Sequence, residues 1–256
     1  VPDPHTLYDG ICALPAGHTC WVDRRSGVQA PRPFASVPAA LRQAETEPNG
    51  RPPRPALREA LLDSVRHHLI ADVDVGLFLS AGLDSATLTA LASELRGNIK
   101  TVTLGFDEFR GTPNNEVPGA ERIACRYGTD HETVWVTQSD FAAAHDDFLG
   151  AMDQPTIDGA NSYFVSRAAR KAGLKVALSG LGGDELFGGY PSFSQIPRLV
   201  AAVGAMPGAA AVGKGLRAVA APVVKRMTSP KYAGLLEYGD DYAGAYLLRR
   251  GLYMPW

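Results

Sequence analysis

The stretch VDVGLFLSAGLDSATLTALASEL, residues 73–95, contains the change of pattern that decides the fold. Its first part is apolar without alternation, which is typical of a parallel strand buried on both faces, and we expect a strand over 75–80. Its last part spaces leucines three or four residues apart, which predicts a helix that ends at Gly97. The turn between the two, residues 80–85, consists mainly of small and polar residues.

This turn, SAGLDS, has the composition of an anion-binding site. The N–H groups of a small-residue turn at the start of a helix attract phosphate. Ser80 and Ser85 would add hydroxyl donors, and Ala81 and Gly82 would allow a close approach. Asp84 would repel a phosphate unless a divalent cation lay between them, so the turn also predicts Mg²⁺. A serine-capped helix start with a glycine turn and no ligand explains the same residues, and the Walker A motif is absent.

From residue 56 onwards the chain alternates strand and helix patterns. Further apolar strands are expected at 100–106, 131–137 and 174–180, with helices between them. This order predicts an α/β fold, in which an open parallel sheet carries helices on both faces and is followed by a C-terminal helical region. Right-handed crossovers then bring the carboxyl ends of the strands to one edge, where ligands bind.

The chain divides into four segments by pattern. Residues 1–46 contain small, broken strands, and the proline- and glycine-rich residues 47–55 read as a linker. The α/β pattern occupies 56–190, and 191–256 form an alanine-rich helical extension that we interpret as incomplete. The absence of an initiating methionine suggests a fragment or a processed form.

A second loop, ALSGLGGDELFGGY at 177–190, repeats the strand-to-turn pattern and adds two acids, Asp184 and Glu185. If its strand lies beside strand 75–80, Asp84 and Asp184 could hold one Mg²⁺ together with phosphate oxygens. Acids at the start of a helix also interact favourably with the helix dipole, which explains the pair without a ligand.

Composition excludes several classes of function. Of the 256 residues, 25 are Lys or Arg and 27 are Asp or Glu, so no broad basic surface for nucleic acid is expected. No apolar stretch is long enough to span a membrane. The three cysteines, Cys12, Cys20 and Cys125, match no metal-ligand spacing and are interpreted as thiols of a reducing, cytoplasmic protein.

The two loops resemble signatures of one family. LSAGLDSA is similar to the pyrophosphate-binding loop of the ATP-pyrophosphatase (PP-loop) superfamily, and LSGLGGDELFGGY resembles the second signature of glutamine-hydrolysing asparagine synthetases. VTLGF, ACRYGTDHETVWVT and DQP (153–155) are supporting matches, and YDGICALPAGHTCWVD resembles the end of the glutaminase domain. The resemblance thus covers nearly the whole chain.

The resemblance implies a fold like that of the adenine nucleotide alpha hydrolases and an ATP-dependent synthesis of an amide. ATP activates a small carboxylate, aspartate or an analogue, as an acyl-adenylate, and ammonia from a glutaminase domain absent here then forms the amide; a homodimer is possible within the family. The implied catalytic residues are Asp84, Asp184 and Glu185, and the implied Mg²⁺ ligands are Asp84 and Asp184. The residues implied to bind the nucleotide are Phe78, Ser80, Ala81, Gly82, Leu83, Asp84, Ser85, Leu104, Gly105, Ser179 and Gly180.

The chain departs from the family pattern at four points. Ala81 replaces a glycine, which is harmless only if its φ is negative. Leu181 replaces a glutamate that the family uses near the acceptor, which leaves the acceptor open. Lys214, Lys225 and Lys231 lack the context of the family's catalytic lysine and are interpreted as solvated. Residue 1 is Val1 rather than the cysteine nucleophile of a glutaminase. A nucleotide-binding module without catalysis therefore stays open as the alternative.

Overall fold

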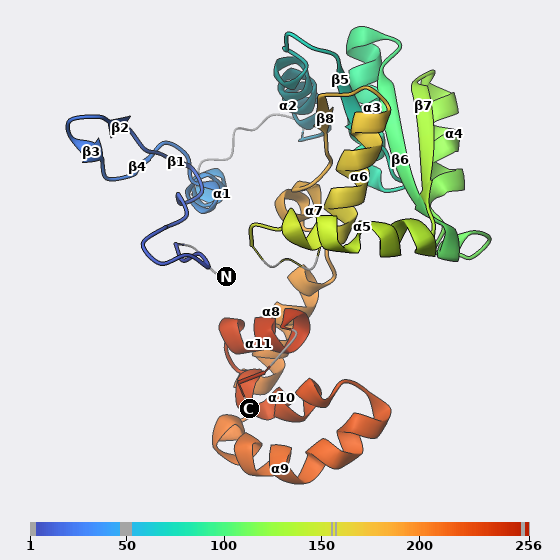
Figure 1. Cartoon of the computed structure of the whole chain (residues 1–256). Helices are drawn as coiled ribbons and strands as arrows, with labels where there is room; N and C mark the ends of the chain where they lie inside the picture. Colours follow the sequence, from blue (N-terminus) through green and yellow to red (C-terminus); the bar gives the residue numbers. More distant parts are fainter. Residues whose placement is uncertain (1–3, 47–52, 155, 157, 252–253, 256) are drawn as a thin grey trace. The chain divides into compact units, whose positions relative to one another are not determined.

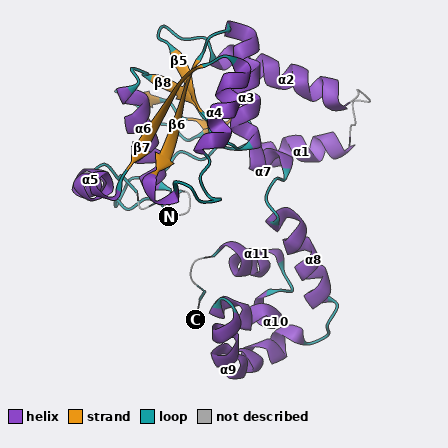
Figure 2. Ribbon diagram, turned by 90° about the vertical axis from the view of Figure 1, so that its right-hand side faces the viewer, coloured by secondary structure: helices purple, strands orange, loops and turns teal. Residues whose placement is uncertain are grey.

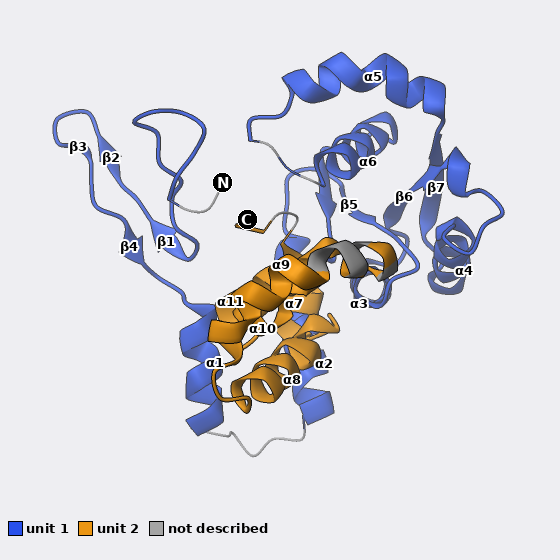
Figure 3. Ribbon diagram, turned by 90° about the horizontal axis from the view of Figure 1, so that it is seen from below, with its two compact units in different colours: residues 1–180 blue, residues 181–256 orange. Residues whose placement is uncertain are grey.

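The computed structural model describes residues 4–46, 53–154, 156, 158–251 and 254–255 (Figure 1). The chain forms two compact units, residues 1–180 and 181–256 (Figure 3), and each is described by itself below. The division at 180/181 precedes the boundary expected at 190/191 by ten residues, so that the second signature begins in one unit and ends in the other. The assignment of these segments as domains stays a prediction.

The first unit contains a four-stranded parallel sheet in the order β7-β6-β5-β8. Its strands are β5 (Val75–Phe78), β6 (Lys100–Phe106), β7 (Asp130–Val136) and β8 (Val176–Leu178). The chain moves outward from β5 through β6 to β7 and then returns to the other side of β5. The register of β5 with β8 pairs Leu77 with Leu178, while Leu77 pairs with Thr101 of β6. The predicted parallel sheet is therefore confirmed.

Helices cover both faces of this sheet, as predicted (Figure 2). One face carries α2 (Pro53–His68), α3 (Leu83–Arg96) and α4 (Val117–Tyr127), and the other carries α5 (Gln138–Gly150) and α6 (Gly159–Lys171). The core alternates accordingly along β5 and β6. Leu77 packs against Leu91 and Ala92 of α3, whereas Val102 packs against Ala168 of α6.

Most of the predicted linker, residues 47–52, lies outside the described residues. Its last three residues are not linker but the first residues of α2, which begins at Pro53. Proline suits the first turn of a helix because the N–H groups there have no partner in the helix. The Pro53–Pro55 segment therefore starts a helix that composition alone assigned to a loop.

The N-terminal segment has two ladders of two-residue strands and one helix. β1 (His18–Thr19) pairs with β4 (Arg32–Pro33), β2 (Val22–Asp23) pairs with β3 (Gly27–Val28), and α1 covers Val37–Thr46. None of the described residues 4–46 is buried. The small predicted strands are thus present, but their interactions are local.

The second unit consists of helices, and its described residues form no strand, as predicted. Its elements are α7 (Gly183–Phe187), α8 (Ser192–Gly204), α9 (Ala209–Met227), the 3₁₀ helix η2 (Pro230–Gly234), α10 (Leu235–Tyr238) and α11 (Tyr242–Arg250). An ion pair between Arg217 and Glu237, 2.7 Å long, joins α9 to α10. Among the described residues, no single helix has the length and apolarity to cross a bilayer, and only α8 taken with part of α9, bent by 104°, meets those criteria.

Candidate nucleotide site

The turn after β5 is held in place by buried groups at both ends. The hydroxyl of Thr103, a fully buried residue of β6, donates a 2.6 Å hydrogen bond to the carbonyl of Leu79 just before the turn. Within the turn, Ser80 Oγ and Ser85 Oγ lie 2.9 Å apart, and Ser80 N donates to Ser85 Oγ over 3.1 Å. The two hydroxyls expected to donate to a phosphate thus also close the turn, and Ser85 is buried.

Ala81 and Leu83 are both exposed at this turn. No described residue other than glycine has a positive φ, so the methyl of Ala81 causes no backbone strain. That methyl packs toward α4, where a Cβ on Gly119 would stand only 2.6 Å from it. Leu83, the first residue of α3, is 81% exposed.

The loop after β8 touches the start of α3. A Cβ built on Gly180 would lie 3.0 Å from the Cβ of Asp84 and 3.0 Å from the backbone nitrogen of Ser85. Contacts of this length are tighter than nine in ten Cβ contacts, so a side chain at position 180 would push the start of α3 by a few tenths of an ångström. After β5 the chain continues to β6 on one side of β5, whereas β8 lies on the other side of β5. The strand order therefore reverses between β5 and β8, and this pair is the switch point of the sheet. The structure therefore brings 80–85 and 179–180 together where ligands bind in open α/β sheets.

The other residues predicted to bind the nucleotide lie on different faces of the sheet. Phe78 and Leu104 are half-buried and pack toward α6. A Cβ built on Gly105 would lie 2.7 Å from the Trp135 ring of β7 and 2.8 Å from the side chain of Val117 of α4. The side chain of Phe78 also lines a cavity of about 500 Å³ between α6 and β8, together with Arg170. Their roles toward the nucleotide stay predictions.

The acids of the second signature belong to α7 in the second unit. Tyr190 donates a 3.0 Å hydrogen bond from its hydroxyl to Glu185 Oε1. A Cβ on Gly189 would stand 1.9 Å from Asp184 Oδ1, so the carboxylate of Asp184 occupies the space that the glycine leaves. The pKa of Tyr190 lies above its usual value, first because of the hydrogen bond to Glu185 and then because of desolvation and the charges of Glu185 and Asp184.

Comparison with known families supports the family resemblance of these two loops. Residues 56–247, which include both, match the family model described as asparagine synthase. The chain belongs to the asparagine synthase family.

Relatives within the asparagine synthase family have moderate sequence identity to this chain. A Mycobacterium tuberculosis protein, named provisionally as a glutamine-hydrolyzing asparagine synthetase, is 37% identical over 201 residues, 76% of this chain and 29% of that protein. Glutamine-hydrolyzing asparagine synthetase 1 of Bacillus subtilis is 37% identical over 52% of this chain and 21% of its own length. Amidase chry2 of Gibberella zeae is 28% identical over 75% of this chain and 30% of its own length. The chain thus spans less than a third of these relatives.

The predicted Mg²⁺ ligands belong to different units, Asp84 to the first and Asp184 to the second. Among the described residues, no three His, Cys, Asp or Glu side chains gather as a metal site. A magnesium ion that a nucleotide brings with it needs only one or two protein carboxylates, since phosphate oxygens and waters supply the rest. Asp84 is half-exposed at the turn, so its hard oxygen donors suit such an ion.

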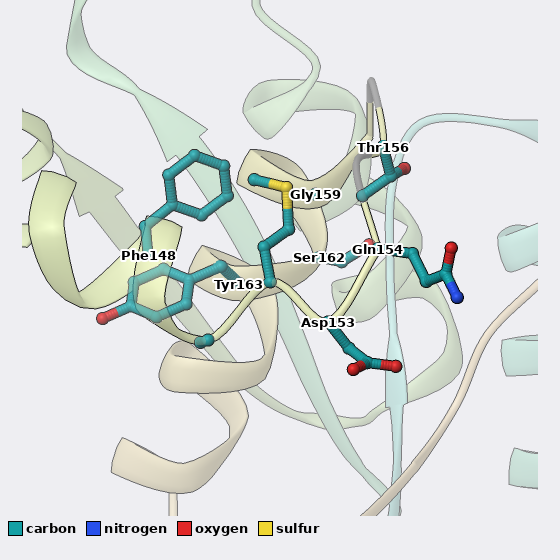
Figure 4. A pocket seen from close by; sticks show the side chains of 9 residues that line it. Phe148, Asp153, Gln154, Thr156, Gly159, Ser162 and Tyr163 are labelled. Carbon is teal, nitrogen blue, oxygen red and sulfur yellow. The ribbon is translucent and has the colours of Figure 1, made fainter. Parts of the chain in front are cut away.

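A pocket that the sequence did not indicate lies between α5 and α6 (Figure 4). Its volume is about 310 Å³, and Phe148, Met152 and Tyr163 form its apolar part. The rings of Phe148 and Tyr163 meet edge to face, with centroids 5.8 Å apart. They come from two helices separated by a loop, and no periodicity within one element predicts that they meet. Asp153 and Gln154 of the DQP match also line the pocket, while Pro155 lies outside the described residues.

One lysine differs from its expected environment. Lys231 is half-buried rather than solvated, and its Nζ donates to the carbonyls of Arg249 and Gly251 over 3.3 and 3.2 Å. Lys214 is exposed as expected, and the side chain of Lys225 lies outside the described part. Leu181, at the position of the family glutamate, is 89% exposed.

Proposed function

We propose that this chain is the ATP-dependent synthetase part of an amide-forming enzyme. A carboxylate oxygen of the substrate attacks the α-phosphorus of ATP, the bond to the β-phosphate breaks, and pyrophosphate leaves. Ammonia then attacks the acyl carbon of the adenylate, AMP leaves, and a proton is lost from the new nitrogen. The observation that carries this proposal is the contact of Gly180 with Asp84 and Ser85, which joins the two signature loops at the switch point of the sheet.

In this proposal the turn 80–85 receives the leaving pyrophosphate. The N-terminus of α3 offers its partial positive charge to an anion, and the mutual hydrogen bond of Ser80 and Ser85 holds the turn in one shape before the ligand arrives. Fixed dipoles that meet developing charge lower the barrier without reorganisation. Asp84 and Asp184 would hold Mg²⁺, which supplies charge neutralisation for the departing phosphates. Gly180, which lies against Asp84, precedes Asp184 by four residues.

We propose a small carboxylate, aspartate or an analogue, as the acceptor. The names of the bacterial relatives support aspartate. Leu181 supports an analogue, because a leucine can neither orient an ammonium group nor accept a proton. Ammonia would come from glutamine through a glutaminase domain, in keeping with the same names.

The test is release of pyrophosphate by the chain with ATP, Mg²⁺, an ammonium salt and a panel of carboxylates. We expect one carboxylate to stimulate release and to yield AMP and an amide in equal amounts. Asp84→Asn should abolish release, whereas Asp74→Asn, an exposed aspartate just before β5, should leave it unchanged. Binding of ATP without release for any carboxylate would contradict synthesis and support a nucleotide-binding module.

A further inference from the structure

Glu185 of the second signature is linked to α11 through two side chains, those of Tyr190 and Arg250. The guanidinium of Arg250, at the end of α11, lies 4.9 Å from the centroid of the Tyr190 ring. Tyr190 in turn holds Glu185 through its hydroxyl. Phe193 also stacks against Tyr190, with the ring planes within 6° of parallel, so the ring has a second contact besides Arg250.

The backbone around Arg250 is itself held firmly. Lys231 donates to the carbonyls of Arg249 and Gly251, the residues on either side of Arg250. Arg249 contacts Gln195 of α8 and donates to the hydroxyl of Tyr232 over 2.9 Å. Leu248, two residues earlier, is completely buried. The exposed guanidinium of Arg250 therefore projects from backbone whose carbonyls on either side accept hydrogen bonds from Lys231.

The charges in this cluster explain why a cation is useful there. Asp184 and Glu185 are neighbours in the first turn of α7, and like charges so close repel each other. The guanidinium of Arg250 lies over the Tyr190 ring, which is the placement that a cation–π contact favours. Its charge also opposes the effect of the two acids on the pKa of Tyr190.

We propose that Arg250 is a positioning residue, which fixes the ring of Tyr190 and through it the carboxylate of Glu185, and that Lys231 holds Arg250 in place. The role of Glu185 in the reaction rests on the proposed function, but the arrangement of the four side chains does not. Loss of the guanidinium would leave the fold and the Phe193 contact intact but remove one of the contacts that hold Tyr190, so that Tyr190 and Glu185 would adopt other rotamers more readily. Arg250 would then affect the rate of turnover more than the binding of ATP.

The first measurement does not depend on activity. Tyrosine labelled with ¹³C at the ζ carbon reports each phenol in the full chain, and Tyr190→Phe identifies the signal of Tyr190. We expect Arg250→Gln to raise the pKa of Tyr190, because a stabilising cation is lost, and Glu185→Gln to lower it. Arg198→Gln, which removes an exposed arginine of α8, should leave it unchanged. An unchanged Tyr190 titration in Arg250→Gln would overturn the proposal.

The second measurement is pyrophosphate release at saturating ATP and carboxylate. We expect Arg250→Gln to lower kcat by about two- to fivefold, the factor that corresponds to one exposed cation–π contact, with the Kd of ATP unchanged. Arg250→Lys, which keeps the charge, should restore part of the rate. A parental kcat in Arg250→Gln would overturn positioning even if the titration moves. If the parent chain releases no pyrophosphate, the proposed function fails, and the titration still decides whether the contact orders Tyr190.

Discussion

Gly180 and Asp84 touch so closely that a single added methyl group at position 180 would stand 3.0 Å from the Cβ of Asp84. This contact joins the two loops that carry the family signatures. It also gives a physical reason for a glycine just after β8, since a side chain there would fit only if the start of α3 shifted by a few tenths of an ångström.

Gly180→Ala should therefore damage the site more than a typical glycine substitution. The new methyl meets backbone atoms, which cannot move aside as a flexible side chain can, so we expect a loss of about 1–3 kcal/mol in the free energy of unfolding. Gly150→Ala is the matched control, because a Cβ there meets nothing within 4 Å. Urea unfolding of both variants measures the difference, and equal stability of the two would contradict the contact.

The packing of Ala81 against Gly119 permits a reciprocal test. Gly119→Ala places two methyl carbons 2.6 Å apart and should destabilise the chain. Adding Ala81→Gly removes the opposing methyl and should recover most of the loss. A double-mutant cycle measures the coupling between the two sites, which we expect to be about 1 kcal/mol or more. Additive effects would show that the turn does not rest on α4 in this way.

His131 should make stability depend on pH. Burial lowers its pKa below the usual value near 6.5, although the charge of Glu121 acts in the opposite direction. Its ring nitrogens lie 2.8 Å from the hydroxyl of Thr101 and 3.2 Å from that of Thr133. The unfolded chain binds the proton more readily than the folded one, so stability is complete above the unfolded pKa and falls as the pH drops below it.

The matching measurement is urea unfolding at several values between pH 5 and pH 8. The free energy of unfolding should decrease toward the acid end in the parent chain. His131→Gln should flatten this part of the profile, whereas substitution of the exposed His145 should not. A free energy of unfolding that increases toward acid pH would contradict a lowered pKa of His131 in the folded chain.

The ion pair of Arg217 with Glu237 should contribute more to stability than the other ion pairs among the described residues. Their side chains are only 17% and 18% exposed, whereas Arg66 and Asp63 are 55% and 61% exposed. Exposed pairs contribute up to about 1 kcal/mol, and breaking a fully buried pair costs about 3–5 kcal/mol. Arg217→Ala should therefore fall between these limits, and Arg66→Ala below them, in thermal or urea unfolding.

The local patterns of the sequence were enough to predict the sheet and the turn at its centre. An unbroken apolar run, followed by SAGLDS and a leucine-spaced helix, places 80–85 at a strand end in any parallel sheet. Strand order is different, because the pairing of Leu77 with Leu178 joins residues a hundred positions apart and no local pattern encodes it. The two signature loops are close because β5 and β8 pair. From the sequence, this closeness could be expected only on the condition that the two strands are neighbours.

Side-chain environments were harder to predict than elements. Lys231 was expected to be solvated because a lone lysine usually is, yet the carbonyls at the end of α11 bind it. The start of α2 at Pro53 was hidden by prolines that usually mark loops. The Phe148–Tyr163 contact depends on how α5 and α6 pack. In each case the outcome depends on contacts between different elements of the fold. The sequence patterns describe only neighbouring residues and do not contain these contacts.

The lack of buried residues in the described part of the N-terminal segment should affect the heat capacity increment of unfolding. Its described residues 4–46 bury no side chain, and Trp21 and Phe34 are 71% and 70% exposed. The heat capacity increment of unfolding arises from apolar surface that becomes hydrated. Melting this segment hydrates almost nothing new, so the increment measured for the chain should be that of a distinctly shorter polypeptide.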